Sequence, residues 1–262
     1  MIIEYHRPES MAEALHYLTH PNTFPLGGGT LLNQKRGNFS VVDLQALKLN
    51  TSRKAGSILS LGSMVTLQSL CNTESIPLAL KRATSLELPL NLRNVATIGG
   101  ALMACSGKSP LLGALMAMDA VIILNTEENI PIGDFLMVRE EEIRGKIITK
   151  IYVRIDMHLA YEQISRTATD KPINYACLAY WSSSRIRLVI GGWGKYPSLA
   201  LDGKTNTNDM EQAVTYAAMN AAQDAADEWA SQEYRSAMAP ILAKRCLDYC
   251  IQMKAASART NP

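Results

Sequence analysis

Residues 25–32 read PLGGGTLL. Glycine adopts backbone angles that a side chain forbids, and three in a row leave successive backbone N–H groups unshielded. A nest of such N–H groups can hold a phosphate or a pyrophosphate. The residues Thr23–Leu26 predict a short strand before the glycines, and residues 31–35 predict a helical turn after them. This segment therefore predicts a strand, an anion-binding loop and a turn in succession.

A second glycine segment, RNVATIGG at residues 93–100, ends a β-prone run. We expect it to form another tight turn, whose backbone N–H groups face the first loop. A glycine pair by itself mostly marks a turn. Two such segments could hold a phosphate or a pyrophosphate from two sides through main-chain donors.

The elements around these segments predict mixed α and β structure. Ser10 and Glu13 form a capping box, which predicts a helix over residues 11–18. Ser109 and Pro110 are typical of a helix start, because serine caps the helix and proline needs no N–H there. The other elements expected in this half are strands at 41–44, 58–61 and 120–124, a helix between 75 and 88, and a helix at 110–118.

The C-terminal half predicts a run of strands and then alanine-rich helices. The expected strands, which suit an antiparallel meander, are 147–155, 158–165, 174–181 and 185–191. A loop is expected next, at 202–209, and two helices follow it, at 210–229 and 233–253. The pattern changes near 154–156, from alternating helices and strands to a run of strands. This change predicts a first domain over residues 1–154 and a second over 155–262, and we expect the first to have subdomains of about 1–56 and 57–154.

The composition excludes several classes of protein. The chain has 262 residues, of which 47% are hydrophobic, and 26 Lys and Arg against 24 Asp and Glu leave a net charge of +2. This balance argues against binding to nucleic acid. Because the sequence shows neither a secretory signal nor an apolar span of about 20 residues, we expect a cytoplasmic protein without a membrane segment.

The reactive side chains indicate neither a metal site nor a catalytic site. The five cysteines form no C-x-x-C pair, so we expect reduced thiols and no metal, although Cys246 and Cys250 are spaced to share a helix face. The four histidines show no arrangement with a nucleophile or a carboxylate pair. Lys35, Arg36 and Lys108 lie next to the glycine segments, where they either bond to phosphate or are solvated surface residues.

Further strings accompany the two glycine segments over nearly the whole chain. They are LGSMVTL at 61–67, AMDA at 117–120, AYEQISR at 160–166, SQEYR at 231–235 and LAKR at 242–245. In this order the set resembles the FAD-binding medium subunit of the molybdenum hydroxylases. That family includes the flavin domain or subunit of xanthine dehydrogenase and of aerobic carbon monoxide dehydrogenase.

The resemblance implies an α+β fold of the vanillyl-alcohol-oxidase type, in which two α/β subdomains clasp an extended FAD and an antiparallel sheet with helices follows. It implies that electrons pass from a 2Fe–2S small subunit through FAD to NAD or another acceptor, and that molybdopterin lies on a large subunit. Arg166 and Asp170 would lie near the cofactor, although a structural ion pair explains them equally well. The residues implied to contact FAD are Gly27, Gly28, Gly29, Thr30, Leu32, Ala96, Thr97, Gly99, Gly100 and Ser109.

Three positions depart from the pattern of the family. Leu31 replaces a polar residue, Ala101 replaces an asparagine, and Pro110 replaces an aspartate at the start of the following helix. Each change removes a side-chain contact to FAD. The alternative hypothesis is therefore a flavin-free structural subunit that keeps the fold and its docking surfaces, and a third is a free-standing flavin oxidase.

Overall fold

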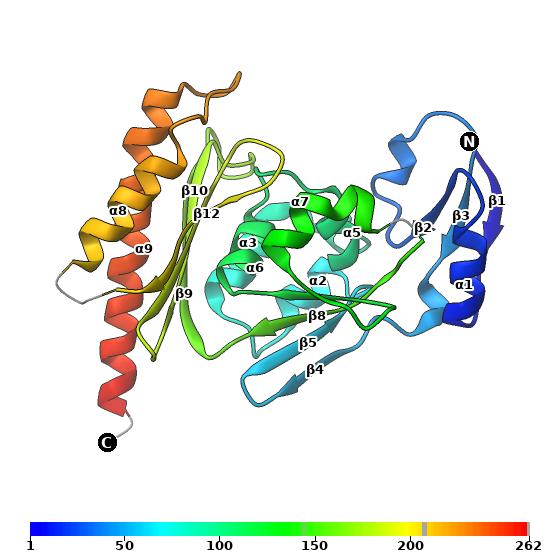
Figure 1. Cartoon of the computed structure of the whole chain (residues 1–262), viewed down its shortest axis with the longest axis horizontal. Helices are drawn as coiled ribbons and strands as arrows, with labels where there is room; N and C mark the ends of the chain where they lie inside the picture. Colours follow the sequence, from blue (N-terminus) through cyan, green and yellow to red (C-terminus); the bar gives the residue numbers. More distant parts are fainter. Residues whose placement is uncertain (144, 206–208, 261–262) are drawn as a thin grey trace. The chain divides into compact units, whose positions relative to one another are not determined.

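The computed structural model describes residues 1–143, 145–205 and 209–260 (Figure 1). By their contacts these residues form two compact units. Unit 1 comprises Met1–Thr73, Leu88–Ala104 and Val121–Val153. Unit 2 comprises Glu74–Glu87, Cys105–Ala120 and the described residues from Arg154 onward. Two segments that precede residue 154 thus belong to unit 2, and the domain limits expected at residue 154 stay a prediction.

Unit 1 contains a parallel three-stranded sheet with the order β1-β3-β2. β3 (Phe39–Asp43) is buried along its whole length and lies between β1 (Ile2–His6) and β2 (Thr23–Leu26). α1 (Met11–Leu18) connects β1 to β2 and has the predicted limits. The Ser10 cap is confirmed, because its hydroxyl accepts the Glu13 N–H, but the Glu13 carboxylate accepts the Glu9 N–H and not the Ser10 N–H that a capping box requires.

Unit 1 also contains a five-stranded sheet with the order β4-β5-β8-β6-β7. β8 (Ile148–Arg154) belongs to this sheet, so its predicted place in the C-terminal meander was wrong. Its alternating apolar residues mark a buried face, but they do not specify the sheet in which that face is buried. The other elements are β4 (Ser52–Ala55), β5 (Ile58–Gly62), β6 (Val121–Leu124), β7 (Asn129–Pro131), α2 (Leu67–Asn72), α4 (Leu90–Arg93), α5 (Ile98–Ala104), α7 (Ile132–Glu142), and the short 3-10 turns η1 (Leu32–Gln34) and η2 (Gln45–Leu47).

Unit 2 is built on an antiparallel meander with the order β12-β11-β10-β9. Its strands are β9 (Met157–Ile164), β10 (Asn174–Trp181), β11 (Arg185–Gly191) and β12 (Ser198–Lys204). β10 is buried from end to end, because helices pack on both of its faces. Leu178 and Ala176 face α8 (Met210–Ala221) and α9 (Gln232–Thr260). Tyr175 packs against α6 (Pro110–Ala117), which lies beside α3 (Leu78–Glu87).

The C-terminal helices differ from the prediction at their ends. α8 ends at Ala221 rather than near 229, because the Asp227 carboxylate accepts the backbone N–H groups of Trp229 and Ala230 and so stabilises a turn. α9 continues past 253, to Thr260. β12 occupies the first part of the loop predicted at 202–209, of which residues 206–208 lie outside the described residues. None of the described helices is long and apolar enough to cross a bilayer.

Candidate functional site

The first glycine segment leaves the carboxyl end of β2 in the parallel sheet of unit 1. Ligands of α/β proteins commonly bind outside the carboxyl ends of parallel strands. Gly29 has a φ of +69°, which a side chain rarely adopts, and its carbonyl accepts the Asn33 N–H at 3.1 Å. The predicted loop and the helical turn after it are both present, the turn as η1.

The two glycine segments lie against each other within unit 1. A Cβ on Gly28 would lie 1.8 Å from the Val95 carbonyl oxygen, and a Cβ on Gly27 would lie 2.8 Å from the Thr97 hydroxyl oxygen. Only glycine lets the loop approach this backbone so closely. The expectation that the two segments face each other at close range is therefore confirmed.

The backbone N–H groups of residues 27–31 are open to a ligand. Within the part of the chain that the structure describes, none of them donates a hydrogen bond to another group of the protein. Gly27 to Thr30 are half-buried, and Leu31 is 50% exposed. Backbone N–H groups at partly exposed positions bond to water where the protein offers no acceptor. This run of donors is therefore available to an external acceptor such as a phosphate oxygen.

The second segment uses its donors internally. It forms the first turn of α5 and not the predicted glycine turn, because carbonyls after β5 and a threonine cap satisfy the turn's N–H groups. Ile98 donates to the Val65 carbonyl and Gly99 to the Ser63 carbonyl, both at 2.9 Å. Gly100 donates to the Thr97 hydroxyl at 3.2 Å. The expectation that these donors point to a ligand was wrong. The segment instead packs against Gly27 and Gly28 of the first loop.

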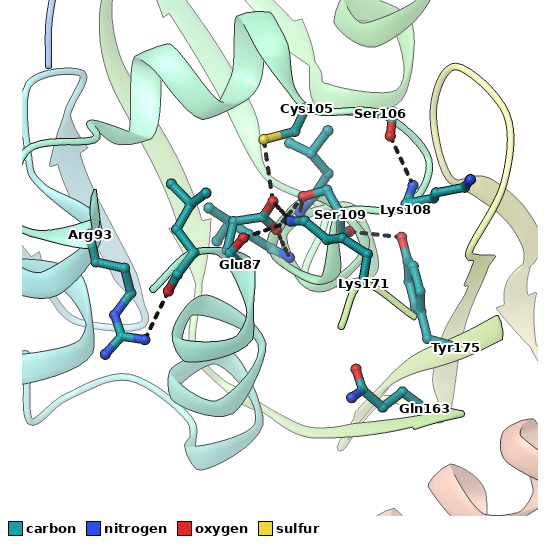
Figure 2. A network of polar contacts seen from close by, with 12 residues as sticks. Glu87, Arg93, Cys105, Ser106, Lys108, Ser109, Gln163, Lys171 and Tyr175 are labelled. Carbon is teal, nitrogen blue, oxygen red and sulfur yellow. Dashed lines mark hydrogen bonds and ion pairs between the residues drawn. The ribbon is translucent and has the colours of Figure 1, made fainter. Parts of the chain in front are cut away.

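Ser109 lies in unit 2 and is almost completely buried, with 1% of its surface exposed. Figure 2 shows its hydroxyl aimed at the Glu87 carboxylate, to which it donates at 2.6 Å. The same hydroxyl accepts the Leu112 N–H at 3.1 Å and so caps α6. The Ser109 carbonyl accepts the Tyr175 hydroxyl at 2.9 Å. The hydroxyl and the carbonyl of Ser109 are thus engaged within unit 2, and its N–H donates to the Ser106 carbonyl at 3.0 Å.

Glu87 organises this cluster, and nothing in the sequence distinguishes it from an ordinary helical glutamate. Its carboxylate also accepts the Leu111 N–H at 3.2 Å and forms an ion pair with Lys171. The Cys105 thiol donates to it at 3.4 Å. Burial, reinforced by the Glu87 charge, raises the pKa of Cys105 to about 12. The thiol therefore stays protonated at neutral pH and is a poor nucleophile.

The other residues singled out in the sequence have different surroundings. Lys35 lies over the Phe24 ring, with its ammonium 4.2 Å from the ring centroid. Lys108 lies 3.6 Å over the Trp229 ring and pairs with Asp227 at 3.3 Å, and Arg166 lies over the same ring. Cys246 and Cys250 share the buried face of α9, as their spacing predicted, and their thiols donate to backbone carbonyls. Among the described residues, no group of three or more metal-ligating side chains is arranged to hold an ion.

Comparisons with known proteins agree with this architecture. Residues 1–153 match the family model described as the FAD binding domain in molybdopterin dehydrogenase. The uncharacterized protein YgfM of Escherichia coli K12 is 28% identical over 83% of this chain and 86% of its own length. The glyceraldehyde dehydrogenase medium chain of Sulfolobus acidocaldarius is 25% identical over 91% and 94%. A carbon monoxide dehydrogenase structure from Hydrogenophaga pseudoflava has the same fold, with a TM-score of 0.83, 24% identity and coverage of 96% and 98%.

The fold and the open glycine loop define an FAD-binding domain. The family model covers more than half of the chain, and the chain belongs to the family of FAD-binding medium subunits of molybdenum hydroxylases. The loop at residues 27–31 fits the cofactor of this family, because a pyrophosphate needs close-lying donors and a backbone without side chains. FAD is therefore the cofactor of this chain.

Proposed function

We propose that this chain is an electron-transfer subunit that accepts electrons from a 2Fe–2S small subunit and passes them through FAD to NAD or another acceptor. The observation that carries the proposal is the run of N–H groups at residues 27–31, which have no acceptor among the described residues and lie beside Val95. In this proposal these groups bond to the pyrophosphate oxygens of the cofactor. Ala96, Thr97, Gly99 and Gly100 fix the position of the loop, and Leu32 begins the turn that closes it.

The changes at Leu31, Ala101 and Pro110 weaken the site without removing its main-chain donors. A neutral hydrogen bond contributes about 0.5–1.5 kcal/mol, so two or three lost side-chain contacts cost about 1–4 kcal/mol. This corresponds to about ten-fold to a thousand-fold in Kd. The backbone of residues 27–31 is unaffected by these substitutions, which favours a retained but weakened FAD site over a lost one.

No catalytic side chain is required on this subunit. FAD supplies the redox chemistry when it is bound, and the protein positions it and excludes competing reactions. The proposal places molybdopterin and the oxidation of the substrate on a large subunit. The name of the archaeal relative, a medium chain, supports an assembly of several subunits. A cytoplasmic location is part of the same proposal.

Flavin binding is tested on the purified full-length chain by its visible absorption and by titration with FAD, followed through quenching of flavin fluorescence. We expect a flavin band, or saturable binding close to one FAD per chain. A colourless protein that does not bind added FAD would contradict the proposal and favour the flavin-free structural subunit.

The partners are tested by affinity isolation of the tagged chain from its own host, with mass spectrometry and metal analysis. We expect two further polypeptides together with iron and molybdenum. Anaerobic bleaching of the flavin band by NADH tests NAD as the acceptor. Oxidase activity of the isolated chain without other subunits would point instead to a free-standing flavin oxidase.

A further inference from the structure

Lys35 follows the open loop of unit 1, and its side chain contacts the strand that precedes the loop. Its N–H donates to the Leu32 carbonyl at 3.1 Å and ends the short turn η1. Its ammonium lies 4.2 Å from the centroid of the Phe24 ring, and Phe24 lies on β2, three residues before Gly27. The residues that precede and follow the loop thus contact each other, and the contact fixes the Lys35 ammonium on the strand that leads into the loop.

This positive charge has no counter-charge in the described part of the chain. Among the described residues, no carboxylate forms an ion pair with the Lys35 ammonium, which contacts the Phe24 ring. An aromatic ring attracts a cation but is not a strong hydrogen-bond acceptor. The three N–H donors of the ammonium therefore remain available to a ligand. Lys108 provides the contrast, because it also lies over a ring but is neutralised by Asp227.

We propose that Lys35 is a phosphate-binding residue of this loop, and that the Phe24 ring holds its ammonium ready for the pyrophosphate of FAD. The inference rests on the proposed function. The neutral N–H groups of residues 27–31 would orient the pyrophosphate through hydrogen bonds, and Lys35 would supply the positive charge that these groups lack. A charge-assisted hydrogen bond between lysine and phosphate is stronger than a bond between neutral groups.

The test compares the full-length Lys35→Met variant with the wild-type chain by titration with FAD. Methionine keeps an unbranched apolar side chain that can still pack on Phe24, but it has no charge. We expect the Kd for FAD to rise about ten-fold or more. Lys35→Arg should restore most of the affinity. Lys54→Met is the matched control, because Lys54 is an exposed lysine on β4 of the same unit, and its Kd should stay within about two-fold of the wild type.

The ionic strength separates phosphate binding from a structural role. If Lys35 contacts phosphate, the Kd of Lys35→Met divided by that of the wild type should shrink at least two-fold between about 0.02 M and about 0.5 M salt. The reason is that salt screens the attraction between the ammonium and the phosphate. A wild-type Kd in Lys35→Met, or a loss that does not change with salt and accompanies a lower Tm, would overturn the inference. Absence of FAD binding by the wild-type chain would instead overturn the proposed function itself.

Discussion

The loop at residues 27–31 and the cluster around Glu87 use their polar groups in opposite ways. In the loop, successive backbone N–H groups have no acceptor among the described residues. Around Glu87, one carboxylate oxygen accepts from Lys171 and Cys105, and the other accepts from Ser109 and the Leu111 N–H. The loop is therefore suited to bind a ligand, and the cluster is suited to hold α3 and α6 together within unit 2.

The difference shows that residues predicted together as cofactor contacts can have different roles, some open to a ligand and others bonded within the protein. Gly99 and Ser109 were predicted to contact the cofactor along with Gly28, because the family resemblance implies contacts from the second glycine segment and from the helix that follows it. The Ser109 hydroxyl and the Gly99 N–H are bonded within the protein, whereas the N–H groups of the first loop have no acceptor among the described residues. The predictions below test this contrast, from the largest expected effect to the smallest.

Replacing Glu87 by alanine should have the largest effect on stability. The free energy of unfolding should fall by about 2–4 kcal/mol, because the buried Ser109 hydroxyl and Leu111 N–H lose their acceptor and Lys171 loses its counter-charge. Urea denaturation measures this change. Glu87→Gln is the control and should lose less, because an amide oxygen still accepts both donors. An alanine variant as stable as the wild type would show that the cluster does not stabilise unit 2.

Gly28→Val should disrupt the open loop. A Cβ would lie 1.8 Å from the Val95 carbonyl oxygen, so the loop must move away from residues 95–97. We expect a cost of about 1–3 kcal/mol in stability and loss of FAD binding. Gly203→Val on β12 is the control, because a Cβ there meets no atom within 4 Å. A Gly28→Val chain that binds FAD with the wild-type Kd would show that the loop does not hold the cofactor.

Ser109→Ala separates a structural role from a cofactor contact. Loss of the cap on α6 and of the bond to Glu87 should cost about 1–2 kcal/mol of stability. The Kd for FAD should stay within about two-fold of the wild type, because the hydroxyl is already engaged. Parallel measurements of urea denaturation and FAD titration decide the matter. A large rise in Kd with little loss of stability would restore Ser109 to the cofactor site.

The smallest effect is expected from Asp202→Asn and appears in the pH dependence of stability. The Arg185 guanidinium, with Arg187 nearby, lowers the pKa of Asp202 below its ordinary value of 3.8. The pair therefore stabilises the fold above that value, and the contribution is lost as the pH falls through the lowered pKa. Asp202→Asn should cost about 0.5–1 kcal/mol at pH 7, and the cost should vanish once the pH has fallen through the lowered pKa of Asp202. Thermal melts over this range should show the two stability curves converging in acid, and parallel curves would contradict the assignment.

Local rules explain the elements that the sequence predicted correctly. The Ser10 cap fixed the start of α1, and Ser109 with Pro110 fixed the start of α6. Alternating and continuous apolar residues located β10 and β11 at their observed limits. These signals depend on neighbours within a few residues, which is why they can be read from the sequence.

Long-range pairing explains the predictions that failed. β8 has the same apolar pattern as the strands of the meander, but it pairs with β5 and β6 in unit 1. The segment at 97–100 has the composition of a turn, yet carbonyls at 63 and 65 accept its N–H groups and it enters α5. Glu87 gave no signal, because its partners Ser109 and Lys171 are distant in the chain.

The sequence alone determined that two glycine-rich segments could approach a ligand without side chains in the way, and it identified the family to which the chain belongs. The tertiary structure decided which of the two still has donors to offer. A backbone N–H group can serve a ligand only where the fold provides no other acceptor, and acceptors come from parts of the chain that local sequence does not reveal.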